Sequence, residues 1–307
     1  MHNIGNYDER LVNFDWKISE DELGYKPGDN INIGWYCTDR ICDMGKGDKL
    51  ALKWEGIGGK EKNYTYNDIR QLSNTIGDFL QKQGIKPEER VCLFLDRIPE
   101  LYIGFAGILK IGAIAQPLFS AFGEESLHVR LDNADTAAII TQKKHLGKVR
   151  RIVETLPHLR TIIVVDDNEK SPLKENEVAL HLDRIERVDA FVHLPYLKTE
   201  SPSLLHYTSG TTGMPKGVMH VHYSLISQYL TTKWVLDVKD DDIYWCTADP
   251  GWVTGTSYGI IGAWASGITQ CVNDIGFSAD AWYKFIEKHK ISIWYSAPTA
   301  IRSLMKA

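Results

Sequence analysis

The sequence predicts an α/β protein built from two doubly wound, largely parallel α/β subdomains. Its 307 residues are 43% hydrophobic and 24% charged, which are proportions typical of globular proteins. From residue 49 onwards, short apolar runs alternate with stretches of helical periodicity, and a second series of this kind begins near residue 203. Regular alternation of strand and helix implies parallel sheets with helices on both faces. We therefore expect an extension over residues 1–48, a first subdomain over 49–200 and a second over 201–307.

The clearest single element is an amphipathic helix that begins after Thr65. Thr65 and Asp68 have the spacing of a capping box, in which each side chain accepts a hydrogen bond from the backbone N–H of the other residue. Gly84 is a natural stop for this helix. Its apolar face repeats at helical spacing through Ile69, Leu72, Ile76 and Phe79. Within residues 1–48, by contrast, only residues 33–43 favour a helix.

Strands and helices then follow in turn along the chain. We expect strands at residues 91–95, 113–118, 137–141, 161–165 and 203–206, and helices at 99–110, 124–133 and 144–155. Residues 298–307 favour a last helix, and neither a glycine nor a polar tail follows Met305. This ending favours a chain that represents the N-terminal part of a longer protein.

The charge balance bears on the class of partner. The formal net charge is −5 and the isoelectric point is near 6.1. An acidic balance gives no electrostatic reason to expect a nucleic acid or an anionic membrane as partner. We therefore expect small-molecule substrates, and the sequence says nothing of the oligomeric state.

Several features of the sequence favour the cytoplasm. Residues 1–10 contain no apolar run and carry Asp8 and Glu9, unlike a signal or transit peptide. No apolar stretch reaches the roughly 20 residues of a membrane span. The cysteines have no zinc-site spacing, so we expect reduced thiols. They are Cys37, Cys42, Cys92, Cys246 and Cys271.

Residues 207–217, which read YTSGTTGMPKG, are the most informative stretch for chemistry. They hold three glycines, four Ser or Thr hydroxyls and one lysine. Such a loop can wrap a polyphosphate, because glycines let backbone N–H groups approach, hydroxyls donate hydrogen bonds and the lysine supplies charge. A solvated loop between two strands is the plain alternative. The Walker pattern does not fit, since Lys216 is followed by Gly217 and not by Ser or Thr.

This stretch resembles the signature of the adenylate-forming enzymes, the superfamily of acyl-CoA synthetases, luciferases and peptide-synthetase adenylation domains. Residues 64–69 and 109–113 are also similar to motifs of that superfamily and stand in the same order. Residues 31–56 and 245–255 resemble the acetyl-CoA synthetases in particular. The resemblance covers nearly the whole chain, and it implies the large N-terminal domain of these enzymes without their small C-terminal domain.

The resemblance implies ATP-dependent activation of a short-chain carboxylic acid, acetate first, to acyl-AMP and then to acyl-CoA. ATP, Mg²⁺ and CoA are the implied cofactors or co-substrates. Lys216 and Thr211 take catalytic roles in this interpretation, with no metal ligand assigned within the chain. The implied phosphate-binding residues are Thr208, Ser209, Gly210, Thr211, Thr212, Gly213 and Lys216. The adenine wall, the acidic Mg²⁺ partner and the catalytic lysine of the superfamily come from later sequence.

Two further sites follow from the resemblance. Trp252, Val253 and Thr254 would line the acyl pocket, with Trp252 at its boundary with the thiol tunnel; a core tryptophan is the alternative for Trp252. The CoA contact would fall on Phe119, Ser120 and Ala121, where relatives commonly have Phe-Gly-Gly, so a plain strand-to-helix loop is equally compatible. Thr256 is a second departure, since acetyl-CoA synthetases often have His there, and this leaves the acyl substrate open.

Other interpretations remain at this point. A propionate-type or medium-chain ligase differs only in the acid. A phosphotransferase would need a lysine followed directly by Ser or Thr. A non-catalytic nucleotide-binding fragment or scaffold would keep the loop without catalysing the reaction. Asp240, Asp241 and Asp242 are interpreted as a solvated acidic turn. The histidines near the loop are interpreted as packing and hydrogen-bonding residues and not as a zinc cluster; they are His206, His220 and His222.

Overall fold

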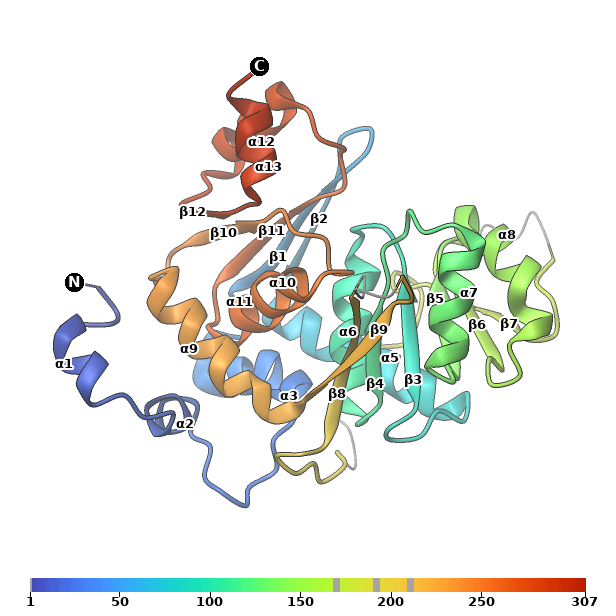
Figure 1. The fold of residues 1–307 in the computed structure, drawn as a ribbon, viewed down its shortest axis with the longest axis horizontal. Coiled ribbons are helices and arrows are strands. Elements are labelled where there is room, and N and C mark those ends of the chain that lie inside the picture. The colour runs from blue at the N-terminus through green and yellow to red at the C-terminus, as the bar shows by residue number, and fades with distance from the viewer. Residues whose placement is uncertain (1, 168–171, 190–193, 209–212) are drawn as a thin grey trace.

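The computed structural model describes residues 2–167, 172–189, 194–208 and 213–307. Its strands form two sheets, one of seven strands and one of five. Figure 1 shows the seven-stranded sheet on the right and the five-stranded sheet in the upper middle of the view. Both are largely parallel and packed with helices, which confirms the predicted α/β class.

The seven-stranded sheet has the order β7-β6-β5-β3-β4-β8-β9. Its strands are β3 (Arg90–Phe94), β4 (Ile114–Pro117), β5 (Ala138–Thr141), β6 (Thr161–Val164), β7 (Glu177–Ala179), β8 (Pro202–Thr208) and β9 (Lys216–Val221). All pairings are parallel except β8 with β9. The helices between these strands are α6 (Pro99–Lys110), α7 (Glu124–Asn133), α8 (Lys143–Ile152) and the single turn η2 (Val153–Thr155).

The five-stranded sheet has the order β12-β10-β11-β1-β2. Its strands are β1 (Leu50–Gly56), β2 (Lys60–Thr65), β10 (Ile243–Cys246), β11 (Thr269–Asn273) and β12 (Ile293–Tyr295). Only β1 with β2 pairs antiparallel. Later helical segments are η3 (His222–Ser224), α9 (Leu225–Val235), α10 (Val253–Thr256), η4 (Ser257–Ile261), α11 (Gly262–Ala265), α12 (Ala279–His289) and α13 (Pro298–Leu304).

Each sheet takes strands from both sides of residue 200. β1 and β2 join the sheet of the later strands, and β8 and β9 join the sheet of the earlier ones. Short-range pattern places a strand but does not say which distant strand it pairs with. A boundary at residue 200 therefore does not separate the two sheets. The division of the chain into two subdomains at this residue stays a proposal.

The N-terminal residues form short helices and not one long helix. They are α1 (Tyr7–Val12), α2 (Lys17–Leu23), α3 (Ile33–Cys37), α4 (Asp39–Ile41) and η1 (Cys42–Lys46). The helix expected over residues 33–43 is broken at Thr38, whose φ of −132° lies outside the helical region. Among the described residues, no helix has the length and apolar character needed to cross a bilayer.

The capping box of α5 (Tyr66–Lys82) is confirmed. Thr65 Oγ1 accepts from Asp68 N at 3.1 Å, and Asp68 Oδ2 accepts from Thr65 N at 2.9 Å. The face that carries Ile69, Leu72 and Ile76 is buried. This face packs on α6, which lies at the centre of the core.

A buried lysine ties the N-terminal helices to this core. Lys110 Nζ lies 2.5 Å from Asp39 Oδ2 and donates to Asn74 Oδ1 at 2.6 Å. The lysine side chain is fully buried, and burial lowers its pKa. At Gly34 a Cβ would come within 2.7 Å of Lys110 Cγ, so a glycine is required where α3 crosses α6.

Candidate functional site

The predicted phosphate loop joins the last two strands of the seven-stranded sheet. β8 ends at Thr208 and β9 begins at Lys216, and these two residues pair across the antiparallel ladder. Thr208, Gly213 and Lys216 are exposed, as a ligand-binding segment requires. The expected strand at residues 203–206 is therefore confirmed and is longer than predicted.

One part of the loop prediction is wrong. Lys216 and Gly217 were expected in the loop, but they begin β9, because their backbone groups pair with Thr208 and Tyr207. Gly213, with φ of +86°, turns the chain before this strand. The predicted residues Ser209, Gly210, Thr211 and Thr212 lie outside the described part of the chain, so their phosphate-binding role stays a prediction.

The proposed acyl wall begins just beyond the carboxyl end of β10. Asp249 shapes the turn there: its Oδ1 accepts from Gly251 N at 2.8 Å, and its backbone O accepts from Trp252 N at 2.9 Å. A Cβ at Gly255 would lie 2.1 Å from Asp249 O, so only glycine lets α10 fold back onto this turn. The helix thus starts immediately after Trp252.

The side chains of this turn are open to a ligand. Trp252 is 59% exposed and Val253 is 42% exposed, and Thr254 is half-buried. Trp252 is therefore not a core residue, which removes the alternative interpretation of this side chain. An exposed aromatic, a small apolar and a small hydroxyl side chain on one helical turn can surround a short acyl chain.

The loop predicted to contact CoA lies against this turn. A Cβ on Gly251 would be 2.8 Å from the backbone N of Phe119, so the two backbones touch. Phe119 and Ser120 are half-buried and Ala121 is exposed. The structure thus brings the acyl and CoA candidate residues together, at the place where β4 of the seven-stranded sheet and β10 of the five-stranded sheet both end. Carboxyl ends of parallel strands are the usual place for ligands in such sheets.

A buried hydrogen bond connects the phosphate hairpin to the acyl wall. His206 on β8 and Thr256 on α10 are almost fully buried, and His206 Nε2 lies 2.8 Å from Thr256 Oγ1. Because that hydroxyl donates to Val253 O at 3.0 Å, we assign the proton to His206 Nε2. Burial and the nearby His220 lower the pKa of His206 to about 4, so the ring is neutral.

His222 has the packing role that was expected of it. Its Nδ1 accepts from the backbone N of Ile33 at 3.1 Å, and burial lowers its pKa to about 3. His220 meets His206 edge to face, with ring centroids 6.0 Å apart. In the described residues, no group of three or more His, Cys, Asp or Glu side chains is placed to hold a metal ion.

Comparison with known proteins matches residues 41–307 to the model of the AMP-binding enzyme family. The chain belongs to this family. It is 40% identical over 316 aligned positions to the acetyl-coenzyme A synthetase of Bacillus subtilis (strain 168), covering 100% of this chain and 53% of that protein. The acetyl-coenzyme A synthetase of Magnetococcus marinus is 32% identical, with coverages of 95% and 47%.

A solved structure agrees with these sequence matches. The acyl-CoA synthetase of Brucella canis superposes with a TM-score of 0.87 at 26% identity, covering 98% of this chain and 54% of that one. The chain therefore spans about half the length of the relatives it matches.

Two further residues shape the candidate site, although no sequence motif pointed to them. Lys148, on α8, donates to the backbone oxygens of Ser120 at 3.2 Å and Phe122 at 2.9 Å, so it holds the predicted CoA loop. Arg97 follows β3, and its positive charge partly offsets the burial that raises the pKa of Asp249. Arg97 acts in the same way on Asp274. Neither residue belongs to a sequence motif, so the role of each became visible only from its interaction with a distant segment in the structure.

Proposed function

We propose that this chain provides the phosphate-binding and acyl-binding parts of an acyl-CoA synthetase that activates a short-chain carboxylic acid with ATP and CoA. The observation that carries the proposal is the hydrogen bond between His206 and Thr256. It places the end of the phosphate-loop strand beside the helix that presents Trp252 and Val253. A polyphosphate and a small carboxylate could therefore meet at one edge of the molecule. The names of the acetyl-CoA synthetase relatives make acetate the first acid to test.

In the proposed reaction, the carboxylate oxygen attacks the α-phosphorus of ATP and the bond to pyrophosphate breaks. The CoA thiol then attacks the carbonyl carbon of the acyl-adenylate, and AMP leaves. Lys216 would hold the negative charge of the β and γ phosphates, with hydroxyl and N–H groups of residues 208–213 beside it. Lys216 is exposed at the start of β9, so it can reach such a ligand.

The other reactants would lie around the turn at Asp249. Trp252, Val253 and Thr254 would enclose the acid, and Phe119, Ser120 and Ala121 would contact CoA. Mg²⁺, when bound with ATP, would neutralise phosphate charge. The described residues offer no metal-ligand cluster, so no step is assigned through it. The five cysteines are free thiols, which supports our proposal that the enzyme works in the cytoplasm.

Residues 1–307 provide only part of the active site in this proposal, because the family's adenine wall and catalytic lysine are not among them. A chimera tests it: residues 1–307 replace the aligned half of the Bacillus subtilis enzyme, and acetate-dependent exchange of pyrophosphate into ATP is measured. We expect exchange by the chimera and none by the 307 residues alone. A folded chimera that exchanges with no carboxylic acid from acetate to butyrate would contradict the function. Turnover by residues 1–307 alone would contradict the proposal that these residues provide only part of the active site.

A further inference from the structure

One arginine side chain, that of Arg130, reaches two segments of the proposed active site. The first segment is the predicted CoA loop, residues 119–122, which lies between β4 and α7. The second is the phosphate hairpin, which consists of β8 and β9. The guanidinium carbon Cζ of Arg130 lies 4.2 Å from the ring centroid of Phe122 in the loop and 5.8 Å from that of Tyr207 on β8. Both distances are within the roughly 6 Å at which an aromatic face attracts a cation.

The direction of this side chain follows from its place in α7. Arg130 belongs to the last turn of the helix, whereas Phe122 precedes its first residue. Helical side chains lean toward the N-terminus of their own helix, so the guanidinium points back along α7. Its Nη1 donates to the backbone oxygen of Ser126 at 2.7 Å. The charged group thereby comes to lie over the ring of Phe122.

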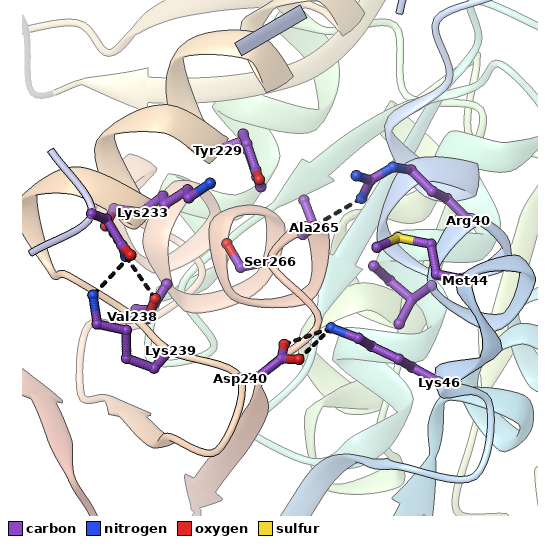
Figure 2. Close-up of a pocket in the computed structure, with 12 residues that line it drawn as sticks. Arg40, Met44, Lys46, Tyr229, Lys233, Val238, Lys239, Asp240, Ala265 and Ser266 are labelled. Atoms are coloured by element: carbon purple, nitrogen blue, oxygen red, sulfur yellow. Dashed lines mark hydrogen bonds and ion pairs between the residues drawn. The ribbon is translucent and has the colours of Figure 1, made fainter. Parts of the chain in front are cut away.

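The aromatic rings are main partners of this half-buried cation. Among the described residues, no carboxylate forms an ion pair with Arg130, and its Nε has no hydrogen-bond partner. Burial lowers the pKa of Arg130. Arg40, shown in Figure 2, has a different arrangement, because its three guanidinium nitrogens all donate to backbone oxygens, Ala265 O among them. Arg130 instead contacts one carbonyl and two rings.

The contact in the loop acts on the proposed CoA site through Phe119. Phe122 meets Phe119 edge to face, with ring centroids 5.9 Å apart, and Phe122 N donates to Phe119 O at 3.0 Å. Phe119 is one of the residues proposed to contact CoA, so a displacement of the Phe122 ring would disturb that contact. Lys148 holds the same loop by a separate route, through the backbone oxygens of Ser120 and Phe122.

The contact in the hairpin acts on the proposed phosphate site through Tyr207. Tyr207 directly precedes Thr208, which pairs with Lys216 across the hairpin. The hydroxyl of Tyr207 lies 3.1 Å from Arg130 O and 2.8 Å from Asn133 Oδ1. The ring is therefore held at its hydroxyl end by α7 and at its face by the guanidinium on the same helix. These contacts fix the end of the strand that carries Thr208.

We propose that Arg130 is a positioning residue that couples the CoA loop to the phosphate hairpin. One guanidinium holds an aromatic ring of each segment, so the places where CoA and the phosphates of ATP would bind keep a fixed spacing. The roles of the two segments rest on the proposed function. The coupling itself rests on the contacts of Arg130 with Phe122 and Tyr207.

The kinetic test uses the chimera with the Bacillus subtilis enzyme and measures the two half-reactions separately. In thioester formation from supplied acyl-adenylate, Arg130→Met should raise the KM for CoA about tenfold, which is a loss of about 1.4 kcal/mol. In pyrophosphate exchange, it should raise the KM for ATP by a similar factor. Each kcat should change much less, because the substitution displaces binding segments and removes no group that contacts a reacting atom. Lys148→Met frees the loop but not the hairpin, so it should raise the KM for CoA alone.

Hydrogen exchange of the 307-residue chain gives a second readout that needs no activity. Arg130→Met should speed amide exchange about threefold or more in residues 119–123 and also in residues 205–208. Phe122→Leu leaves Arg130 in place and removes only the ring in the loop, and it should still speed exchange in residues 205–208. Exchange within α5 should stay unchanged in both variants, which would show that the rest of the protein is folded.

Arg187→Met is the matched control. Arg187 is exposed and forms its ion pair with Asp68 at the start of α5, not with the loop or the hairpin. Its loss should change neither KM and should leave exchange in residues 119–123 and 205–208 unchanged. An effect of Arg130→Met on one segment alone, or losses in kcat with both KM values unchanged, would overturn the proposal. A chimera that exchanges no pyrophosphate would contradict the proposed function, whereas hydrogen exchange would still decide whether Arg130 couples the two segments.

Discussion

His206 Nε2 lies 2.8 Å from Thr256 Oγ1 in an almost fully buried contact between β8 and α10. The same hydroxyl donates a hydrogen bond to Val253 O. The Thr256 side chain thus contacts both the strand of the phosphate hairpin and the first turn of the acyl wall.

The first prediction concerns this hydrogen bond. Thr256→Val keeps the shape but leaves the N–H of His206 buried without an acceptor, so it should cost about 1–3 kcal/mol of unfolding free energy. Thr256→Ser keeps the hydroxyl and should cost less. His206→Leu combined with Thr256→Val should cost less than the sum of the two single changes, because the pair is lost together. Urea unfolding of the 307-residue chain measures all four, and strictly additive losses would show that the contact contributes nothing.

A second prediction concerns Lys110. Lys110→Met removes the ammonium group and leaves Asp39 and Asn74 without it, so it should destabilise the protein by about 3–5 kcal/mol. Lys17→Met is the matched control, because Lys17 pairs with Asp21 at 2.8 Å with both side chains more than 60% exposed. That control should leave the unfolding free energy nearly unchanged, because both charges stay in water. Similar effects of the two changes would contradict the central role of the buried pair.

The third prediction is a loss of stability in mild acid. The pKa of His206 is lowered to about 4 and that of His222 to about 3, against about 6.5 in an unfolded chain. Between these values the unfolded state binds protons that the folded state does not, so stability falls as the pH falls. Each histidine contributes up to ~1.4 kcal/mol per pH unit within this window.

The measurement is the unfolding free energy between pH 6.5 and 4.5. In that window, acids such as Glu177, whose pKa is lowered by its ion pair with Arg150, add little, because they matter mainly below about pH 4.3. His222→Asn keeps an acceptor for the backbone N of Ile33 and removes the titrating ring. It should make the pH dependence shallower, and an unchanged slope would rule out His222 as a source.

A fourth prediction tests Lys216 in the chimera with the Bacillus subtilis enzyme. Lys216→Ala should slow adenylate formation by about 10–100-fold, since a charged hydrogen bond contributes roughly 1.5–3 kcal/mol. Thioester formation from supplied acyl-adenylate should change much less, because pyrophosphate has already left. Pyrophosphate exchange and single-turnover thioester formation measure the two steps, with Lys284→Ala as the control. Equal losses in both steps would contradict the role proposed for Lys216.

The fifth prediction tests the acyl wall. Val253→Ala enlarges the space beside Trp252, so the ratio of butyrate to acetate turnover in the chimera should rise about tenfold. This corresponds to the roughly 1–3 kcal/mol that one methylene contributes to discrimination. Val235→Ala, at a 77% exposed position at the end of α9, should leave the ratio unchanged. A constant ratio in Val253→Ala would place the acyl chain elsewhere.

The local elements of this fold could be predicted, because their signals lie within a few residues. The helices expected at residues 99–110 and 124–133 are α6 and α7 with the same bounds. The capping box of Thr65 and Asp68 likewise needs only the spacing of two residues. The close approach of α3 to α6 at Gly34 could not be predicted, because it joins segments about 70 residues apart and a helical pattern says nothing of such a contact.

The candidate site also contains residues that the sequence could predict and residues that it could not. The resemblance pointed to Thr208, Lys216 and Trp252, and the structure puts them at exposed positions suited to ligands. Lys216 belongs to a strand and not to a loop, since its position depends on pairing with Thr208. The contacts of Lys148 and Arg97 join segments far apart in the sequence, and no periodicity or spacing reports such contacts.

The pairing of β1 with β11 has a consequence for synthesis on the ribosome. Leu52 lies opposite Gln270, and Trp54 lies opposite Val272, so β1 emerges long before its parallel neighbour exists. At roughly 5–20 residues per second, the delay is on the order of ten to forty seconds. During that time, the β1–β2 hairpin has an unpaired edge with apolar side chains, a form prone to join other chains. Nascent chains of this protein should therefore depend on chaperones until residue 273 has left the exit tunnel.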